Sequence, residues 1–354
     1  MVRTVILKMA SDSLPSLSKS SLIRDVWAEN LEAEFAVIRS LLKDYPFVAM
    51  DTEFPGVVAK PVGTFKTTHE FYYQALRCNV NLLKLIQLGI TLLNERGEVP
   101  EKCCTWQFNF EFSLTDDVYA QDSIELLKNG GINFDYFARH GIHMSHFAEL
   151  LYSSGLVLND EIRWLAFHAG YDFGYLMKLL LNRELPEKED EFNIMFHTMF
   201  PLVFDIKYLL RQTDIAHSSG LDYLADMLGV RRFGTAHQSG SDSLLTGHSF
   251  FKLLKEKLGG SLPHASNGVL YGLSEDAATT ATPSIVTPAG VGAMSPISSN
   301  VNHTTSSNNT AVNIASPPQI TAPNNNAFPN TPLMSMVMHG SRHDSKVHQA
   351  PTKA

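Results

Sequence analysis

The sequence Y-P-F-V-A-M-D-T-E-F-P-G occupies residues 45–56 and decides the fold. Its apolar run at residues 47–50 is typical of a buried strand. The run ends in two carboxylates, Asp51 and Glu53, and residues two apart on a strand point to the same face. We therefore expect both carboxylates side by side at the rim of a sheet, where the following Phe-Pro-Gly ends the strand.

This pair of carboxylates predicts either a cation site or an ordinary acidic strand end. Two like charges held beside a hydrophobic sheet repel each other and lose hydration, so one takes up a proton unless a cation lies between them. A hard divalent ion such as Mg²⁺ prefers oxygen ligands of this kind. Because Asp-x-Glu occurs about once by chance in a chain of this length, the pair alone leaves both interpretations open.

The overall composition permits one large domain or two ordinary ones, since the chain has 354 residues, 44% of them hydrophobic and 18% charged. The formal net charge of −8 gives no global basic surface for nucleic acid. An acidic protein still binds a polyanion if its carboxylates hold metal ions and its basic residues are locally grouped. The charge therefore excludes binding through overall basicity, but not binding at a metal site.

Cysteine usage and hydropathy indicate a soluble, intracellular protein. Three cysteines without a Cys-x-x-Cys motif are typical of a reducing compartment and predict no disulfide framework. The N-terminal apolar stretch is too short for a signal peptide, and no run of 18 apolar residues occurs. We expect no membrane association.

Composition divides the chain into three parts. Residues 1–22 are rich in serine and are predicted to be disordered, whereas residues 23–274 carry the periodic apolar patterns of one domain. From residue 275 the chain is mainly Ser, Thr, Asn, Pro and Ala with few charges, which cannot bury enough apolar surface to offset chain ordering. Residues 275–354 are therefore predicted to form a disordered, low-complexity tail.

The order of predicted elements indicates an α/β or α+β domain with helices on a mixed sheet. Turn residues at 94–97 predict a hairpin between strands 85–92 and 105–110. Aromatic and polar residues alternate in the second of these strands, which predicts one buried face. Ser241 is expected to cap a long helix that starts at Asp242. The remaining elements are helices at 27–42, 72–83, 123–128, 134–139, 143–152, 171–181, 191–199 and 221–228, and strands at 164–168 and 203–206.

Three histidines, His140, His143 and His146, recur at helical spacing and raise the alternative of a second metal site. No carboxylate or cysteine joins them at ligand spacing, and Mg²⁺-type sites use oxygen ligands. We therefore favour an ordinary structural role for these three residues.

Four acidic residues occupy comparable places in the predicted fold. Asp51, Glu53, Asp172 and Asp242 each lie at a strand end or a helix start, where the rim of a sheet and a helix N-terminus can meet. His237 precedes Asp242 by five positions, in a loop with Gly and Ser that can bend the imidazole toward the same point. The sequence thus allows four carboxylates and one imidazole to converge, a set suited to metal-assisted hydrolysis.

The motifs around these residues resemble the DEDD exonuclease superfamily: D-T-E at 51–53, F-H-A-G-Y-D at 167–172 and H-Q-S-G-S-D at 237–242. The His-x4-Asp spacing is similar to that of the DEDDh branch. Longer segments resemble the catalytic deadenylase subunit (Caf/Pop type) of the eukaryotic carbon-catabolite-repression–NOT complex, here called the CCR-NOT complex. The resemblance runs over residues 22–273, with Ser239 where the family usually has Ala. The segments that carry it include V-A-M-D-T-E-F-P-G at 48–56, W-Q-F-N-F at 106–110, Y-A-Q-D-S-I-E-L-L at 119–127 and S-D-S-L-L-T-G at 241–247.

This resemblance implies a ribonuclease H-like fold, with a mixed central β-sheet flanked by α-helices. It further implies two divalent cations, Mg²⁺ or Mn²⁺, roughly 3.5–4 Å apart, which clamp the attacking and leaving oxygens of a phosphodiester. Asp51 would bridge both ions, and Glu53 and Asp242 would complete the first site. Asp172 would hold the second ion, and His237 would be the general base for the attacking water.

The implied activity is 3′→5′ removal of mRNA poly(A) tails with release of 5′-AMP. Two alternatives remain: a docking scaffold within the complex, which the presence of all five catalytic positions argues against, or an exonuclease on other RNA 3′ ends. Phe54 and His168 are candidate RNA contacts, because aromatic side chains stack on bases in single-strand channels. Each of the two could equally be a core residue.

The partners implied by the resemblance are poly(A) RNA, the large platform subunit of the CCR-NOT complex and a second deadenylase with leucine-rich repeats. Antiproliferative adaptors of the Tob/BTG type are expected where the cell has them, and no membrane partner is expected. The implied setting is mRNA decay and translational repression in the cytoplasm and nucleus, including cytoplasmic mRNA-processing bodies.

Overall fold

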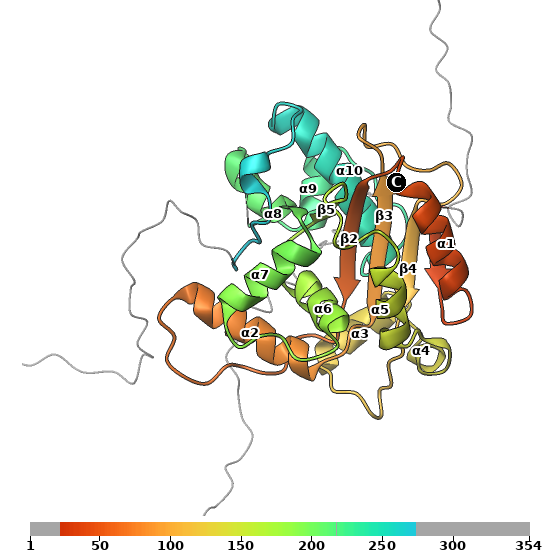
Figure 1. Ribbon diagram of the computed structural model, residues 1–354, viewed down its shortest axis with the longest axis vertical. Helices are drawn as coiled ribbons and strands as arrows, with labels where there is room; N and C mark the ends of the chain where they lie inside the picture. Colours follow the sequence, from red (N-terminus) through yellow and green to blue (C-terminus); the bar gives the residue numbers. More distant parts are fainter. Residues whose placement is uncertain (1–21, 217, 274–354) are drawn as a thin grey trace, which may run out of the picture. The chain divides into compact units, whose positions relative to one another are not determined.

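The computed structural model describes residues 22–216 and 218–273 and contains one mixed six-stranded sheet (Figure 1). Its strand order is β1-β4-β3-β2-β5-β6. Strand β3 runs antiparallel to both β2 and β4, whereas the pairs β1–β4, β2–β5 and β5–β6 are parallel. The strands are β1 Ile23–Val26, β2 Phe47–Glu53, β3 Gln87–Leu93, β4 Thr105–Asn109, β5 Arg163–Ala166 and β6 Leu202–Asp205.

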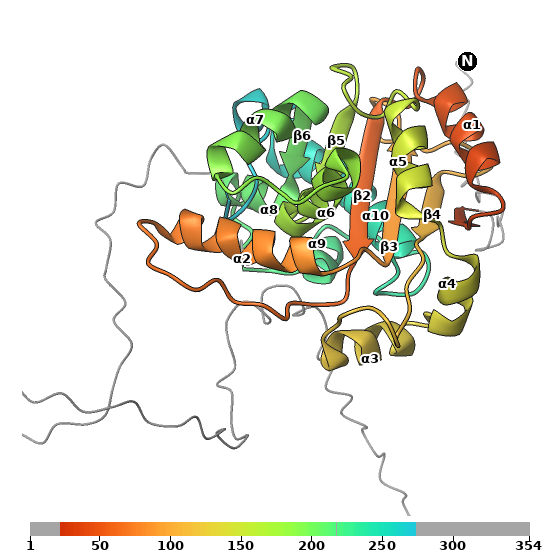
Figure 2. The same ribbon diagram turned by 60° about the horizontal axis from the view of Figure 1, so that its bottom comes forward.

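Helices cover both faces of this sheet. In Figures 1 and 2 the long helix α10 lies across one face, and α5 and α6 lie across the other. Among the described residues, no helix is both long and apolar enough to cross a membrane. The helices are α1 Leu31–Leu41, α2 Thr68–Leu82, α3 Gln121–Asn129, α4 Phe134–His140, α5 Met144–Tyr152, α6 Gly170–Leu181, α7 Glu189–Met199, α8 Ile206–Leu209, α9 Leu221–Met227 and α10 Ser239–Lys257, with 3-10 turns at Leu210–Gln212 and His264–Ser266.

The alternation of side chains along β2 assigns each residue to one of two apolar cores. Val48 and Met50 belong to the core that also contains Phe147 of α5 and Phe173 of α6. Phe47 and Ala49 belong to the second core, which contains Phe250 and Leu253 of α10. By the same alternation, Asp51 and Glu53 continue on the α10 face and Thr52 lies on the α6 face. The strand therefore presents acids toward one helix and a hydroxyl toward another.

The predicted mixed sheet with flanking helices is confirmed, and three local predictions are wrong. Strand β4 is buried on both faces, because α10 covers its polar side as well. Helix α10 begins at Ser239, so Ser241 lies inside the helix and does not cap it. The first helix begins at Leu31, and Trp27 instead packs against Tyr136.

Strand β1 was not predicted at all. It is four residues long, and its partner β4 lies about eighty positions away, with Ile23 opposite Thr105. A short strand of this kind has no periodic signal, and only its distant partner stabilises it. Disorder was predicted for residues 1–22 and 275–354, which lie outside the described residues except for Leu22. The backbone carbonyl of Leu22 accepts hydrogen bonds from Cys104 and Thr105.

Candidate metal centre

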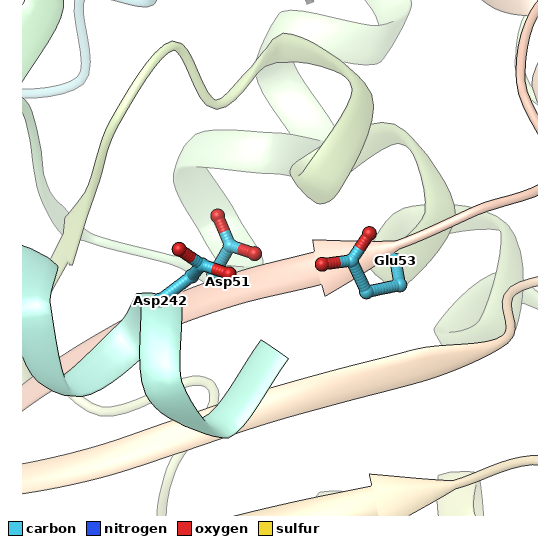
Figure 3. A group of neighbouring side chains, drawn as sticks. All are labelled: Asp51, Glu53 and Asp242. Carbon is cyan, nitrogen blue, oxygen red and sulfur yellow. The ribbon is translucent and has the colours of Figure 1, made fainter. Parts of the chain in front are cut away.

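Three of the four predicted acids meet at the end of β2. Asp51, Glu53 and Asp242 each place one carboxylate oxygen within 4.8 Å of the others. Figure 3 shows Asp51 and Glu53 projecting from β2, with Asp242 reaching them from the first turns of α10. An all-oxygen set that spans 4.8 Å suits a hard divalent cation such as Mg²⁺. Within the described part of the chain, this is the group of side chains that fits a metal ion.

The backbone of α10 reaches the sheet because two glycines make room for it. Gly89 of β3 pairs with Asp51, and a β-carbon on Gly89 would overlap the carbonyl group of Ser239. A β-carbon on Gly240 would lie 2.8 Å from Ile23 and 3.0 Å from the side chain of Gln107. Only glycine permits such close backbone approach. The first turn of α10 therefore lies against the sheet, and this places Asp242 of α10 over β2.

Two glutamines from the sheet satisfy the N-terminus of α10. The helix has no side-chain cap of its own, although the first N–H groups of any helix need acceptors. Gln87 accepts a hydrogen bond from the backbone N–H of Ser239 at 3.3 Å, and Gln107 accepts one from Gly240 at 3.0 Å. Both glutamines also donate to the side-chain oxygen of Gln238, at 3.1 and 3.0 Å. This amide network fixes the segment that carries His237 and Asp242.

The fourth acid, Asp172, lies beside this group on the other side of β2. It is buried in the first turn of α6, and the Thr52 hydroxyl donates to its Oδ1 at 2.6 Å. Asp172 is not one of the three acids whose oxygens lie within 4.8 Å of one another. Its charge nevertheless raises the pKa of both Asp51 and Glu53. The structure thus gives three acids in one cluster and a fourth adjoining it.

The electrostatics of the cluster favour a bound cation. Burial raises the pKa of Asp51 and of Glu53 well above the usual carboxyl range, and the neighbouring charges of Asp242 and Asp172 raise both further. Burial also raises the pKa of Asp172 to about 6, although the Thr52 hydrogen bond opposes that shift. A divalent ion would remove this mutual repulsion and stabilise the ionised forms. The residues present therefore fit the cation that their chemistry suggests.

His237 directly precedes the α10 segment and is held against Asp242. Its backbone N–H donates to Asp242 Oδ2 at 3.0 Å. Its φ of 62° lies in the left-handed region, which is uncommon for a residue with a side chain. Burial raises the pKa of Asp242, and the neighbouring side chains of Arg232 and, to a smaller extent, His237 oppose that shift.

The two candidate RNA contacts lie near the cluster, and both also contact other protein groups. Phe54 follows β2 directly and stacks on Tyr171, with ring centroids 5.2 Å apart and planes 11° apart. His168 has a left-handed φ of 62°, and its backbone N–H donates to Asp205 at 2.9 Å. Its ring meets Tyr271 edge-on at 5.2 Å. These contacts leave the RNA-binding role of both residues a prediction.

The structure separates the three histidines of the alternative metal site. His140 ends α4 and stacks on Tyr136, with ring centroids 4.2 Å apart. His143 precedes α5, and His146 within α5 lies 3.4 Å from Glu32. They are not part of the carboxylate group that fits a cation, and the structural role that we favoured for them stays a prediction.

Sequence reasoning missed Arg232, which pairs with Asp242 at 2.7 Å and with Asp222 at 2.6 Å. It also missed Thr52 as the hydrogen-bond partner of Asp172. The alternation of β2 could have placed Thr52 on the α6 face. The position of Arg232 in the sequence does not indicate a role at the site, because its two partners come from two different helices.

Carboxylate clusters that fit divalent cations occur in phosphatases, polymerases and nucleases, and the comparisons with known proteins decide among these classes. The sequence matches the CAF1 family ribonucleases over residues 26–153 and 144–250, and the chain belongs to this family. The probable CCR4-associated factor 1 homolog 7 of Arabidopsis thaliana is 53% identical over 257 residues, which are 71% of this chain and 93% of the relative. The poly(A) ribonuclease pop2 of Schizosaccharomyces pombe is 48% identical over 256 residues, 72% of this chain and 76% of the relative.

Solved structures agree with this assignment. The S. pombe Pop2p structure in its Mg²⁺- and Mn²⁺-bound form has a TM-score of 0.70 and 48% identity, and covers 72% of this chain and 100% of its own. CAF1 co-crystallised with the yeast NOT1 MIF4G domain has a TM-score of 0.61 and 34% identity, with 73% and 100% coverage. The predicted family and the ribonuclease H-like fold are therefore confirmed.

Proposed function

We propose that the chain is a 3′→5′ exoribonuclease that shortens mRNA poly(A) tails and releases 5′-AMP. The observation that carries this proposal is the cluster of Asp51, Glu53 and Asp242 in a member of the CAF1 ribonuclease family. The name of the S. pombe relative, poly(A) ribonuclease, supports the substrate. The Mg²⁺ and Mn²⁺ in the Pop2p structure support the two divalent cations.

Each predicted site residue has a role in this proposal. Asp51, Glu53 and Asp242 would hold the first cation, and Asp172, with Asp51 shared between the sites, would hold the second. When bound, the cations stabilise the charge that develops on the reacting phosphodiester. His237 would take the proton from the attacking water, since it is held beside Asp242 at the edge of the cluster.

Phe54 and His168 would line the path of the 3′-terminal nucleotides in the same proposal. Phe54 follows Glu53 in the sequence and is half-buried rather than buried, so the residue keeps some surface that a ligand could contact. A base could extend the stack that Phe54 forms with Tyr171. His168 lies four residues before Asp172, on the segment that leads into α6.

The assembly and location of the protein are further parts of the proposal. CAF1 was co-crystallised with the NOT1 MIF4G domain in the yeast structure, and this supports the large platform subunit of the CCR-NOT complex as a partner. We extend this to the leucine-rich-repeat deadenylase and the Tob/BTG-type adaptors, and to a place in the cytoplasm, nucleus and mRNA-processing bodies. A scaffold role alone is disfavoured, because the three acids are assembled in a geometry that fits a cation.

A labelled-RNA digest tests the activity. The full chain is incubated in Mg²⁺ with oligoadenylate that carries the label at its 5′ or its 3′ end, and with other homopolymers. We expect the 3′ label to appear at once as a mononucleotide and the 5′ label to move down a ladder, with adenylate degraded fastest and EDTA stopping the reaction. Internal cleavage, or an equal rate on every homopolymer, would contradict the proposal. The Asp51→Asn variant serves as the inactive control. A full chain that is no more active than this variant would favour the scaffold alternative.

A further inference from the structure

We propose that Arg232 is a positioning residue for the metal centre: it fixes the orientation of Asp242 for cation binding, and Asp222 in turn fixes Arg232. This inference rests on the proposed metal-dependent function. Arg232 lies in the segment between α9 and α10, ten positions before Asp242, and it is mostly buried, with 18% of its side chain exposed.

All three guanidinium nitrogens of Arg232 have partners. Nη1 lies 2.7 Å from Asp242 Oδ1 and donates to the Ser241 hydroxyl at 2.9 Å. Nε and Nη2 donate to Asp222 Oδ1 at 3.0 and 2.6 Å. Because α9 supplies Asp222 and α10 supplies Asp242, the guanidinium joins two helices. Asp222 would hold Arg232 in place whether or not Asp242 is engaged by a cation.

Asp242 is consequently held at both of its carboxylate oxygens. Oδ1 faces Arg232, and Oδ2 accepts the backbone N–H of His237 at 3.0 Å. Each carboxylate oxygen has two lone pairs, so both can still bind a cation. Outer partners that orient a ligating group contribute strongly to metal affinity. Asp242 comes from a helix and not from β2, so its orientation toward Asp51 depends on these two contacts.

The charge of Arg232 also compensates part of the repulsion in the cluster. Its attraction opposes the effect of burial on Asp51, Glu53 and Asp242. One arginine cannot balance four acids, so repulsion among them remains. A divalent ion would remove that repulsion, while Arg232 keeps Asp242 oriented.

Mn²⁺ binding to the full chain tests this role, followed by electron paramagnetic resonance of the free ion at neutral pH. We expect Arg232→Met to weaken Mn²⁺ binding by at least about 10-fold, the typical effect of losing an outer partner of a ligand. Asp222→Asn should weaken it less, and Arg232→Lys should restore part of the affinity. Arg231→Met is the matched control, because the exposed Arg231 side chain lies over the Phe233 ring and should leave binding unchanged.

Chemical rescue separates positioning from folding. In Arg232→Gly, guanidinium ion at millimolar concentration should restore Mn²⁺ binding, and circular dichroism in EDTA should match that of the unchanged chain. If Arg232→Met does not fold, the Mn²⁺ affinities of Asp222→Asn and of Arg232→Gly with guanidinium test the proposal instead. Unchanged or tighter Mn²⁺ binding in the Arg232 variants would overturn the proposal, as would an equal loss in Arg231→Met. Normal Mn²⁺ binding by Asp51→Asn in the same titration would instead overturn the proposed metal site.

Discussion

Gly89 lies directly beneath the carbonyl group of Ser239, so close that a β-carbon on Gly89 would overlap it. Gly89 pairs with Asp51 across the β2–β3 ladder, and Ser239 is the first residue of the helix that carries Asp242. One backbone contact therefore sets how near α10 comes to β2. The cluster of three carboxylates depends on that distance.

Gly89→Ala should displace the first turn of α10 and weaken the site. Overpacking a buried position typically costs about 1–3 kcal/mol of stability, and we expect the upper end because the obstructing atoms are backbone atoms. Urea unfolding should show the loss, and oligoadenylate trimming should fall by about 10-fold or more, as a small misplacement of reacting groups often causes. Gly174→Ala is the control, since the nearest neighbours of its β-carbon would be side-chain atoms of Leu76 and Val80 and not backbone atoms. A Gly89→Ala protein with unchanged activity would show that this contact does not set the site.

Asp51→Asn should abolish trimming and, without metal, stabilise the fold. The substitution removes a buried charge that repels Asp242, Asp172 and Glu53, and an amide is a poor ligand for the proposed cations. We expect activity to fall by about a thousandfold or more, since removing a group essential to a catalytic unit has effects of that size. The melting temperature in EDTA should rise. Glu149→Gln, on the exposed side of α5, should change neither quantity. A lower melting temperature for Asp51→Asn would contradict the repulsion described above.

Metal binding should release protons at mildly acidic pH. Burial raises the folded-state pKa of Asp172 to about 6 from its ordinary value of 3.8, and burial and the neighbouring acids raise those of Asp51 and Glu53 as well. A raised carboxyl pKa destabilises the metal-free fold above that pKa, and the cost disappears as the pH falls below the ordinary value. Calorimetric Mn²⁺ titrations in buffers of different ionisation enthalpy should therefore show proton release at pH 6, and less at pH 9. Asp172→Asn should release fewer protons at pH 6, and an equal release would be evidence against the shift.

His237→Asn should slow trimming by about 10²–10⁴-fold, the usual contribution of a general base, while Mn²⁺ affinity stays nearly unchanged. Asparagine suits this position because it tolerates the left-handed backbone that His237 adopts, with φ at 62°. The backbone N–H that binds Asp242 is retained. Rapid-quench measurement of the first turnover isolates the chemical step. Urea unfolding of His237→Asn and His237→Ala measures the backbone strain separately. Alanine tolerates the left-handed backbone less well than asparagine, so the difference in the free energy of unfolding reports that strain.

Local patterns in the sequence predicted most of the secondary structure and the residues of the candidate site. The apolar run before Asp51 indicated a buried strand, and the D-T-E spacing placed two acids on one face. The predicted strand ends and helix starts then added Asp172, His237 and Asp242, and the segments that resemble deadenylases implied the role of each. The long helices and the hairpin turn at residues 94–97 were predicted for the same reason, since hydrophobic periodicity and turn residues act over a few positions.

Tertiary structure decided everything that depends on partners far apart in the chain. Ile23 pairs with Thr105, Gln87 and Gln107 cap a helix that begins at Ser239, and the polar face of β4 is buried because that helix covers it. The sequence by itself determined which acids are available. How those acids meet was decided by two tertiary contacts: α10 packs on Gly89, and Arg232 pairs with Asp242. These contacts join segments that are far apart in the sequence, so no local periodicity predicts them.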